Sequence, residues 1–232
     1  MDGHGDMSQL IRGALEFQRR VFKSKRSLFG RLAKGQRPPT LFITCSDSRI
    51  NPNLLTMTEP GELFILRNAG NLVPPHGAPV GGEAATIEYA VAALHVTDIV
   101  VCGHSHCGAM QGLLHPESLT SLPEVAEWLK YAQAIAPGLA DVPAESRLDR
   151  AIEANVLLQL EHLRGLPSVA NALAARSVRL HGWVYRFETG DVGAYDPVTA
   201  QFVSLSEKAR LMGLASAGAT AAVEPEPKES TI

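Results

Sequence analysis

Short apolar runs rich in β-branched and aromatic residues recur along the first half of the chain. They lie at residues 40–44, 63–66 and 99–102. Runs of this length and composition are typical of strands that are buried on both faces. A fourth candidate strand, residues 177–187, alternates between apolar and polar positions, and a fifth lies at residues 201–205. The pattern therefore predicts a central sheet of at least five strands.

Helical spacing of apolar positions fills much of the sequence between these runs. An alanine-rich segment, residues 81–94, lies between the second and third runs and has the length that a crossover between parallel strands requires. Residues 124–136 and 148–163 are further helix candidates, and residues 8–35 predict one or two helices that end at Gly35. These helices are expected to cover a mostly parallel sheet.

The expected fold is a single α/β domain over residues 8–206, with a mostly parallel central β-sheet flanked by helices. Residues 8–35 form an N-terminal helical arm in this interpretation. The turn-rich segment 191–197 is expected to join the last two strands as an antiparallel hairpin, which leaves an antiparallel C-terminal edge strand. The small, polar, proline-containing residues 216–232 are predicted to be a disordered tail.

Composition and charge change this picture little. The chain has 232 residues, 45% of them hydrophobic, and a formal net charge of -3 without a large basic block, which argues against nucleic acid as a partner. No apolar run approaches the roughly 20 residues that cross a bilayer, and the N-terminus lacks the pattern of a secretory signal. We therefore expect a cytoplasmic protein with no membrane partner.

The candidate chemistry follows the first and third predicted strands. Cys45 comes directly after the first, and His104 and Cys107 come after the third. Because ligands bind at the carboxyl ends of parallel strands, these three side chains are expected to meet there. Two thiolates and one imidazole suit Zn²⁺, and three protein ligands leave a fourth position open for water, as in catalytic sites. Cys102 lies inside the apolar run and is expected to belong to the core.

With these residues in view, the chain resembles the β-class carbonic anhydrases. The family joins a Cys-x-Asp-x-Arg motif to a later His-x-x-Cys-Gly motif, and both are present at residues 45–49 and 104–108. Further segments that match the family are 59–64, 67–73, 87–91 and 181–185. The resemblance implies reversible hydration of carbon dioxide to bicarbonate, with one zinc ion per subunit. Residues 106–110 are also similar to the carboxysomal branch, so carboxysome association is a further hypothesis.

The resemblance also implies roles for two charged residues. In the family an Asp–Arg pair orients the nucleophile, and Asp47 and Arg49 occupy these positions. In some members the aspartate leaves its arginine and becomes a fourth zinc ligand, which closes the site. Gly82, Gly103 and Gly108 are candidates for close backbone approach to the site, with ordinary turn and cap formation as the alternative.

Three histidines are candidates for proton export, because histidine alone has an unperturbed pKa near neutrality. They are His76, His106 and His115, and the sequence does not distinguish among them. The resemblance further implies a homodimer or a higher even-numbered homo-oligomer, in which the arm at residues 8–35 wraps over the partner.

One departure from the family concerns regulation. Members that close their site on binding bicarbonate resemble one another in a Trp–Arg–Tyr pocket. This chain matches Arg67 and Tyr185, whereas Phe42 stands at the tryptophan position. Phenylalanine has no N–H donor, so bicarbonate is expected to stabilise the closed state less, and Asp47 is expected to stay paired with Arg49.

Three other functions remain open from the sequence. A hydrolase acting on carbon disulfide or carbonyl sulfide would use the same ligands with different access to the pocket. A zinc-bearing binding or shell-scaffold protein would not need Asp47 and Arg49. A thiol-redox enzyme would need a resolving cysteine at short spacing, and Cys102 with Cys107 is not a Cys-x-x-Cys pair.

Overall fold

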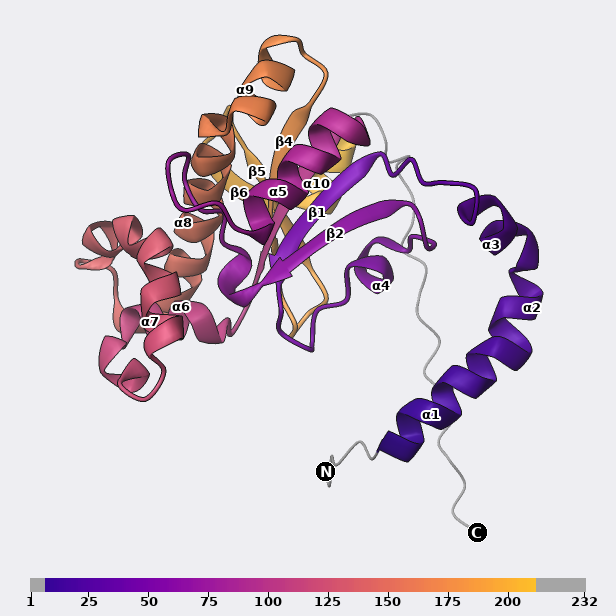
Figure 1. Ribbon diagram of the computed structural model, residues 1–232. Helices are drawn as coiled ribbons and strands as arrows, with labels where there is room; N and C mark the ends of the chain where they lie inside the picture. Colours follow the sequence, from indigo (N-terminus) through magenta and orange to yellow (C-terminus); the bar gives the residue numbers. More distant parts are fainter. Residues whose placement is uncertain (1–6, 212–232) are drawn as a thin grey trace.

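The computed structural model describes residues 7–211, and its centre is a six-stranded sheet in the order β2-β1-β3-β4-β5-β6 (Figure 1). The strands β2, β1, β3 and β4 are parallel, and β5 and β6 are antiparallel to their neighbours. The strand bounds are β1 Thr40–Cys45, β2 Leu63–Asn68, β3 Asp98–His104, β4 Arg179–Tyr185, β5 Val192–Asp196 and β6 Gln201–Ser204.

The helices connect and cover these strands. Their bounds are α1 Met7–Glu16, α2 Phe22–Ser24, α3 Arg26–Leu32, α4 Pro52–Thr56, α5 Gly82–Glu88, α6 Gly108–Leu114, α7 Pro123–Leu129, α8 Ala144–Gly165, α9 Pro167–Ala174 and α10 Leu205–Leu211. Short π-helical turns continue α1 over Phe17–Val21 and α5 over Tyr89–Ala93, and 3₁₀ turns lie at Ala69–Asn71, Pro116–Leu119 and Lys130–Leu139.

The two faces of the sheet are covered unequally. Successive side chains of a strand point to opposite faces, so Leu41 and Ile43 enter one cluster and Phe42 enters the other. The larger cluster lies under α5, α8 and α9, and its helix residues recur at the spacing of one helical face. The smaller cluster is built around Phe42, Ile50, Val100 and Cys102. Most of the hydrophobic stabilisation therefore lies on the α8 side of the sheet.

The N-terminal helices α1 to α3 form an arm that lies apart from the sheet (Figure 1). None of their residues is buried, although several are large and apolar. The arm is anchored at its C-terminal part, where Lys25 pairs with Glu59. The apolar side chains of α1 therefore have no cover within the described part of this chain, whereas those of α3 are half-buried.

The predicted α/β class, the parallel core and the helical arm are confirmed by this architecture. One expectation was wrong in detail, because the segment 191–197 contains strand β5 instead of a simple connection. Gly193 and Asp196 are turn-forming residues, and the short segment becomes a strand only because β4 and β6 pair with its two edges. The sheet thus ends in two antiparallel strands.

Several helix boundaries also differ from the prediction. The helix expected at 148–163 begins earlier, at Ala144, and the one expected at 124–136 passes into a 3₁₀ turn after Leu129. The predicted tail, residues 216–232, lies outside the described residues. Within residues 7–211, no helix combines the length and the apolar character needed to span a bilayer.

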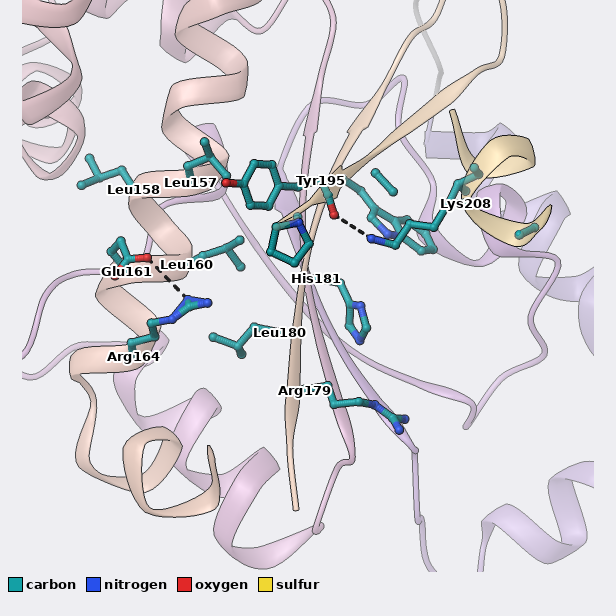
Figure 2. A pocket seen from close by; sticks show the side chains of 16 residues that line it. Leu157, Leu158, Leu160, Glu161, Arg164, Arg179, Leu180, His181, Tyr195 and Lys208 are labelled. Carbon is teal, nitrogen blue, oxygen red and sulfur yellow. Dashed lines mark hydrogen bonds and ion pairs between the residues drawn. The ribbon is translucent and has the colours of Figure 1, made fainter. Parts of the chain in front are cut away.

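A cavity of about 770 Å³ lies between α8, β4, β5 and α10 (Figure 2). It opens because β5 pairs with β4 only from Trp183 to Tyr185 and then diverges. Leucine side chains of α8 form one wall, and Lys208 of α10 donates to the carbonyl oxygen of Tyr195 on the other. None of the candidate catalytic or metal-binding residues lines this cavity.

Close packing of α8 against β4 yields a prediction about Gly182. A Cβ atom there would lie 2.9 Å from Cγ1 of Val156 and 3.1 Å from Cδ1 of Leu160. We expect Gly182→Ala to lower the free energy of unfolding by about 1–3 kcal/mol, because an added methyl group overpacks this layer. Gly165→Ala, at a position with open space, is the control. Urea unfolding of both variants checks this, and equal midpoints would contradict it.

Candidate metal centre

Three elements bring Cys45, His104 and Cys107 together. Cys45 is the last residue of β1, His104 is the last residue of β3, and Cys107 directly precedes α6. Because β1 and β3 are parallel neighbours, their carboxyl ends lie at the same edge of the sheet. The two Sγ atoms and a ring nitrogen of His104 all lie within 4.8 Å of one another, and all three residues are buried. Pairing of β1 with β3 therefore brings together Cys45 and His104, which are about sixty residues apart in the sequence.

The imidazole of His104 is oriented for metal binding. Its Nδ1 lies 2.8 Å from the carbonyl oxygen of Ser105, so this nitrogen carries the proton and donates. Its Nε2 is buried and has no hydrogen-bond partner among the described residues. A buried polar atom without a partner is costly, and a metal ion would satisfy it.

The donor set fits zinc in both type and spacing. Tetrahedral zinc with bonds of about 2.3 Å to sulfur and 2.0 Å to nitrogen places its ligand atoms about 3.5–3.8 Å apart. The observed cluster, with all ligand atoms inside 4.8 Å, needs only small side-chain adjustments to reach this geometry. Two thiolates and one imidazole are a soft set that suits zinc.

The two clustered thiols differ in acidity. The neighbouring Cys107 and His104 side chains and the Gly70 N–H stabilise the Cys45 thiolate and lower the pKa of that thiol. The pKa of Cys107 is raised, because its proton is held by Cys45 and its loss would place a second negative charge in a buried site. A cation between the two sulfur atoms would remove this repulsion.

Cys102 lies in the core, as the sequence predicts. It is fully buried in the smaller hydrophobic cluster, whereas Cys45 and Cys107 belong to the larger one. Burial raises the pKa of its thiol to about 12. Cys102 therefore has neither the position nor the acidity to act with the other two cysteines.

Asp47 and Arg49 form a two-pronged ion pair beside the cluster. Nε of Arg49 donates to Oδ1 of Asp47 over 2.9 Å, and Nη2 donates to Oδ2 over 2.7 Å. This pairing, with the backbone N–H of Arg49, holds the pKa of Asp47 well below its usual range. Oδ2 of Asp47 also lies 3.9 Å from Nε2 of His104. An ionised carboxylate thus stands beside the atom that faces the metal position.

The loop that carries Asp47 is held by Arg67, which the sequence analysis singled out only as a residue of the family's bicarbonate pocket. Its guanidinium donates to the carbonyl oxygens of Cys45 and Asp47, over 3.0 and 2.7 Å. The N–H of Gly70 donates to Sγ of Cys45 over 3.4 Å. Both residues fall in the segment 67–73, and for Gly70 the match of that segment to the family was the only signal in the sequence.

The loop between His104 and Cys107 is held by hydrogen bonds and an ion pair to Glu188. The carboxylate of Glu188 accepts from Oγ of Ser105 over 2.9 Å and pairs with the ring of His106. Oγ of Ser105 also accepts from the N–H of Phe187 over 2.9 Å. Hydrogen bonding to its own backbone, to Ser105 and to His106 lowers the pKa of Glu188. No motif in the sequence pointed to Glu188.

The three candidate glycines lie in different surroundings. Gly103 packs against α8, where a Cβ atom would lie 3.0 Å from side-chain atoms of Ile152 and Val156. Gly82 and Gly108 are the first residues of α5 and α6 and have open space at the Cβ position.

The three histidines are separated in the structure. His106 lies in the loop between the two later ligands and pairs with Glu188. His115 directly follows α6 and pairs with Glu117, and His76 lines a groove with the proline-rich loop at 74–80. Of the three, His106 alone belongs to the ligand loop.

A buried Cys–His–Cys group at a sheet edge, with an ion-paired carboxylate beside it, is the arrangement expected of a catalytic metal site. Comparison with known proteins agrees. The sequence profile of the carbonic anhydrase family matches residues 40–192.

Curated relatives share this assignment over most of the chain. A carbonic anhydrase of Pseudomonas aeruginosa is 50% identical over 204 residues, covering 87% of this chain and 93% of the relative. One of Synechocystis sp. is 47% identical, covering 85% and 74%. Carbonic anhydrase 1 of Escherichia coli O157:H7 is 45% identical, covering 93% and 100%.

Solved structures identify the class. The β-carbonic anhydrase CcaA superposes with a TM-score of 0.83 at 47% identity, covering 85% of this chain and 98% of that chain. A tetrameric β-carbonic anhydrase of Sordaria macrospora gives 0.73 at 30% identity, covering 81% and 95%. The chain belongs to the β-class carbonic anhydrase family. It is an enzyme, and its reaction is the reversible hydration of carbon dioxide to bicarbonate.

Proposed function

We propose that the enzyme works with one zinc ion per subunit, held by Cys45, His104 and Cys107. The observation that carries this proposal is the buried cluster of three soft ligand atoms, with Nε2 of His104 left without a partner among residues 7–211. When bound, zinc would lower the pKa of a water molecule toward neutrality and so supply a hydroxide nucleophile for carbon dioxide. Three protein ligands leave the fourth position for this chemistry.

Asp47 and Arg49 have complementary roles in this proposal. Because its pKa is lowered, Asp47 is ionised at neutral pH and accepts hydrogen bonds only. Its carboxylate accepts the hydrogen of the nucleophile and so turns an oxygen lone pair toward carbon dioxide. Arg49 fixes that carboxylate with two parallel hydrogen bonds. Carbon dioxide and water become bicarbonate, and one proton leaves to solvent.

The alternatives from the sequence are less well supported. A thiol-redox function would need a partner for Cys45 or Cys107, and Cys102 lies in a different cluster. A non-catalytic scaffold protein would not need the Asp47–Arg49 ion pair beside the cluster. Use of carbon disulfide or carbonyl sulfide would need the same ligands, and the named relatives are carbonic anhydrases. Neither the described structure nor the comparisons support carboxysome association, and a cytoplasmic location remains a prediction.

The arm supports a homo-oligomer with an even number of subunits. Leu10 and Ile11 of α1 are 64% and 54% exposed, and Leu15 and Phe17 are also exposed. An uncovered apolar helix face of this kind marks a protein interface. The smaller core cluster around Phe42 leaves the second face of the sheet thinly covered, so a second subunit would bury both surfaces. The relative from Sordaria macrospora is described as tetrameric.

The zinc assignment predicts opposite results for two cysteines. We expect Cys107→Ser to lose stoichiometric zinc and to reduce carbon dioxide hydration by more than the about 10- to 100-fold typical of outer-shell changes, because a hydroxyl is a far poorer zinc ligand. Cys102→Ser is the matched control and should keep the metal. Metal analysis and stopped-flow hydration check this. Zinc lost from Cys102→Ser but retained by Cys107→Ser would refute the assignment.

The departure at Phe42 from the family's Trp–Arg–Tyr pocket predicts that bicarbonate does not close the site. Phe42 is buried against Trp183, with ring centroids 6.0 Å apart, and offers no donor to an anion. Its replacement of tryptophan removes roughly the 1–3 kcal/mol of a hydrogen bond to a charged group. We therefore expect Asp47 to remain on Arg49 at pH 7 in excess bicarbonate.

The same reasoning predicts the pH profile. Asp47 stays ionised far below neutrality because its pKa is lowered, so kcat/KM should fall with acidity as a single one-proton titration of the nucleophile. A crystal structure with bicarbonate and the pH profile of kcat/KM test both statements. Bicarbonate beside Arg67 with Asp47 at the metal, or a profile steeper than one proton, would contradict them.

The oligomer proposal predicts that charge on the apolar face of α1 separates the subunits. We expect Leu15→Glu to lower the molar mass measured by light scattering, because the interface would have to bury an unpaired carboxylate. Gln9→Glu adds the same charge to an exposed polar position of the same helix and serves as the control. If both variants kept the wild-type mass, α1 would have no part in assembly.

A further inference from the structure

Helix α8 carries two polar residues on its buried face. Asn155 and Gln159 are 1% and 0% exposed and are one helical turn apart. Their neighbours on this face, Ile152, Val156 and Leu160, are apolar members of the core. A buried amide without partners is costly, so each must be explained by what it binds.

The two amides form a chain of hydrogen bonds that ends at the loop after β2. The N–H of Val73 donates to Oε1 of Gln159 over 2.8 Å, and Nε2 of Gln159 donates to Oδ1 of Asn155 over 2.9 Å. Nδ2 of Asn155 then donates to the carbonyl oxygen of Gly70 over 2.9 Å. Each bond fixes which end of the next amide is the donor, so the chain has one direction.

The loop needs such support because glycine, with no Cβ atom, can adopt more backbone conformations than other residues, and Gly70 lies in this loop. Its φ is 79°, in the left-handed region, and a Cβ atom would lie 2.9 Å from Cβ of Ala109. The peptide before Gly70 is held by Trp128, whose Nε1 donates to the carbonyl oxygen of Ala69 over 2.8 Å. The peptide after Gly70 is held by Asn155. Together they fix the direction of the Gly70 N–H, which donates to Sγ of Cys45.

We propose that Asn155, oriented by Gln159, is a positioning residue for the metal centre. It holds the peptide after Gly70, as Trp128 holds the peptide before it, and so fixes the direction of the Gly70 N–H that donates to the Cys45 sulfur. This inference rests on the proposal that Cys45 is a zinc ligand. A hydrogen bond to a ligating thiolate withdraws electron density from sulfur and orients it. Without the bond, the sulfur is less well placed and donates more charge to the metal.

The test compares Asn155→Leu with Leu160→Ala. The first removes the donor to Gly70 while keeping a side chain of similar size. The second makes a cavity in the same buried face of α8, next to Gly182 and without a hydrogen bond to the loop. Circular dichroism and thermal unfolding establish that both fold and how much stability each loses.

Two readouts separate positioning from simple destabilisation. Zinc affinity is measured by competition with a chelator, and the thiolate-to-metal charge-transfer bands are recorded on cobalt-substituted protein. We expect Asn155→Leu to weaken zinc binding about 10- to 100-fold and to shift the bands to lower energy. Leu160→Ala should change neither. Equal results for the two variants would overturn the proposal.

A milder variant keeps the test decisive if Asn155→Leu does not fold. Gln159→Met frees Asn155 to rotate without removing it, and it should produce smaller changes in the same direction. Unchanged zinc affinity and unchanged bands in a folded Gln159→Met protein would then overturn the proposal. Failure of the zinc assignment itself would look different, because wild-type protein would then lack zinc and cobalt–thiolate bands.

Discussion

Parallel pairing of β1 with β3 is the interaction on which the site depends. It places the ends of two strands at one edge of the sheet, so Cys45 and His104 meet although they are far apart in sequence. A hydrogen-bonded ladder fixes this distance more firmly than loops could. The third member of the cluster, Cys107, lies three residues after His104 and directly before α6. The metal centre is therefore a consequence of sheet register.

The loops at this edge are held by side chains that do no chemistry themselves. Arg67 holds the carbonyl groups around Asp47, Glu188 holds the ligand loop through Ser105, and Asn155 holds Gly70. Each of these hydrogen bonds gives a partner to a polar group that would otherwise have none, and each holds a loop in one conformation. A rigid surrounding of this kind allows three ligands to keep their geometry before a metal arrives.

The fold class and the cluster of Cys45, His104 and Cys107 were predictable because their signals are local. Buried parallel strands appear as apolar runs, and Cys45, His104 and Cys107 follow such runs directly. Cys102 was separable from the other cysteines because it lies within a run. Strand β5 was missed because Gly193 and Asp196 favour turns, and only pairing with β4 and β6 makes the segment extended. Glu188 carries no spacing relation to the motif that it supports.

The sequence by itself determined the α/β class, the family resemblance and the identity of the side chains that could bind zinc. Residue type and strand pattern are properties of the chain and need no distances. Tertiary structure alone decided that Nε2 of His104 faces the cluster, that Arg49 grips Asp47 with two bonds, and that Gly70 donates to Cys45. His104 and Cys45 lie on different strands and Gly70 lies in the loop after β2, so their directions depend on tertiary packing that no single segment encodes. Asp47 and Arg49 lie in one loop, and that loop is held by contacts with Arg67 and with the carbonyl oxygen of His106.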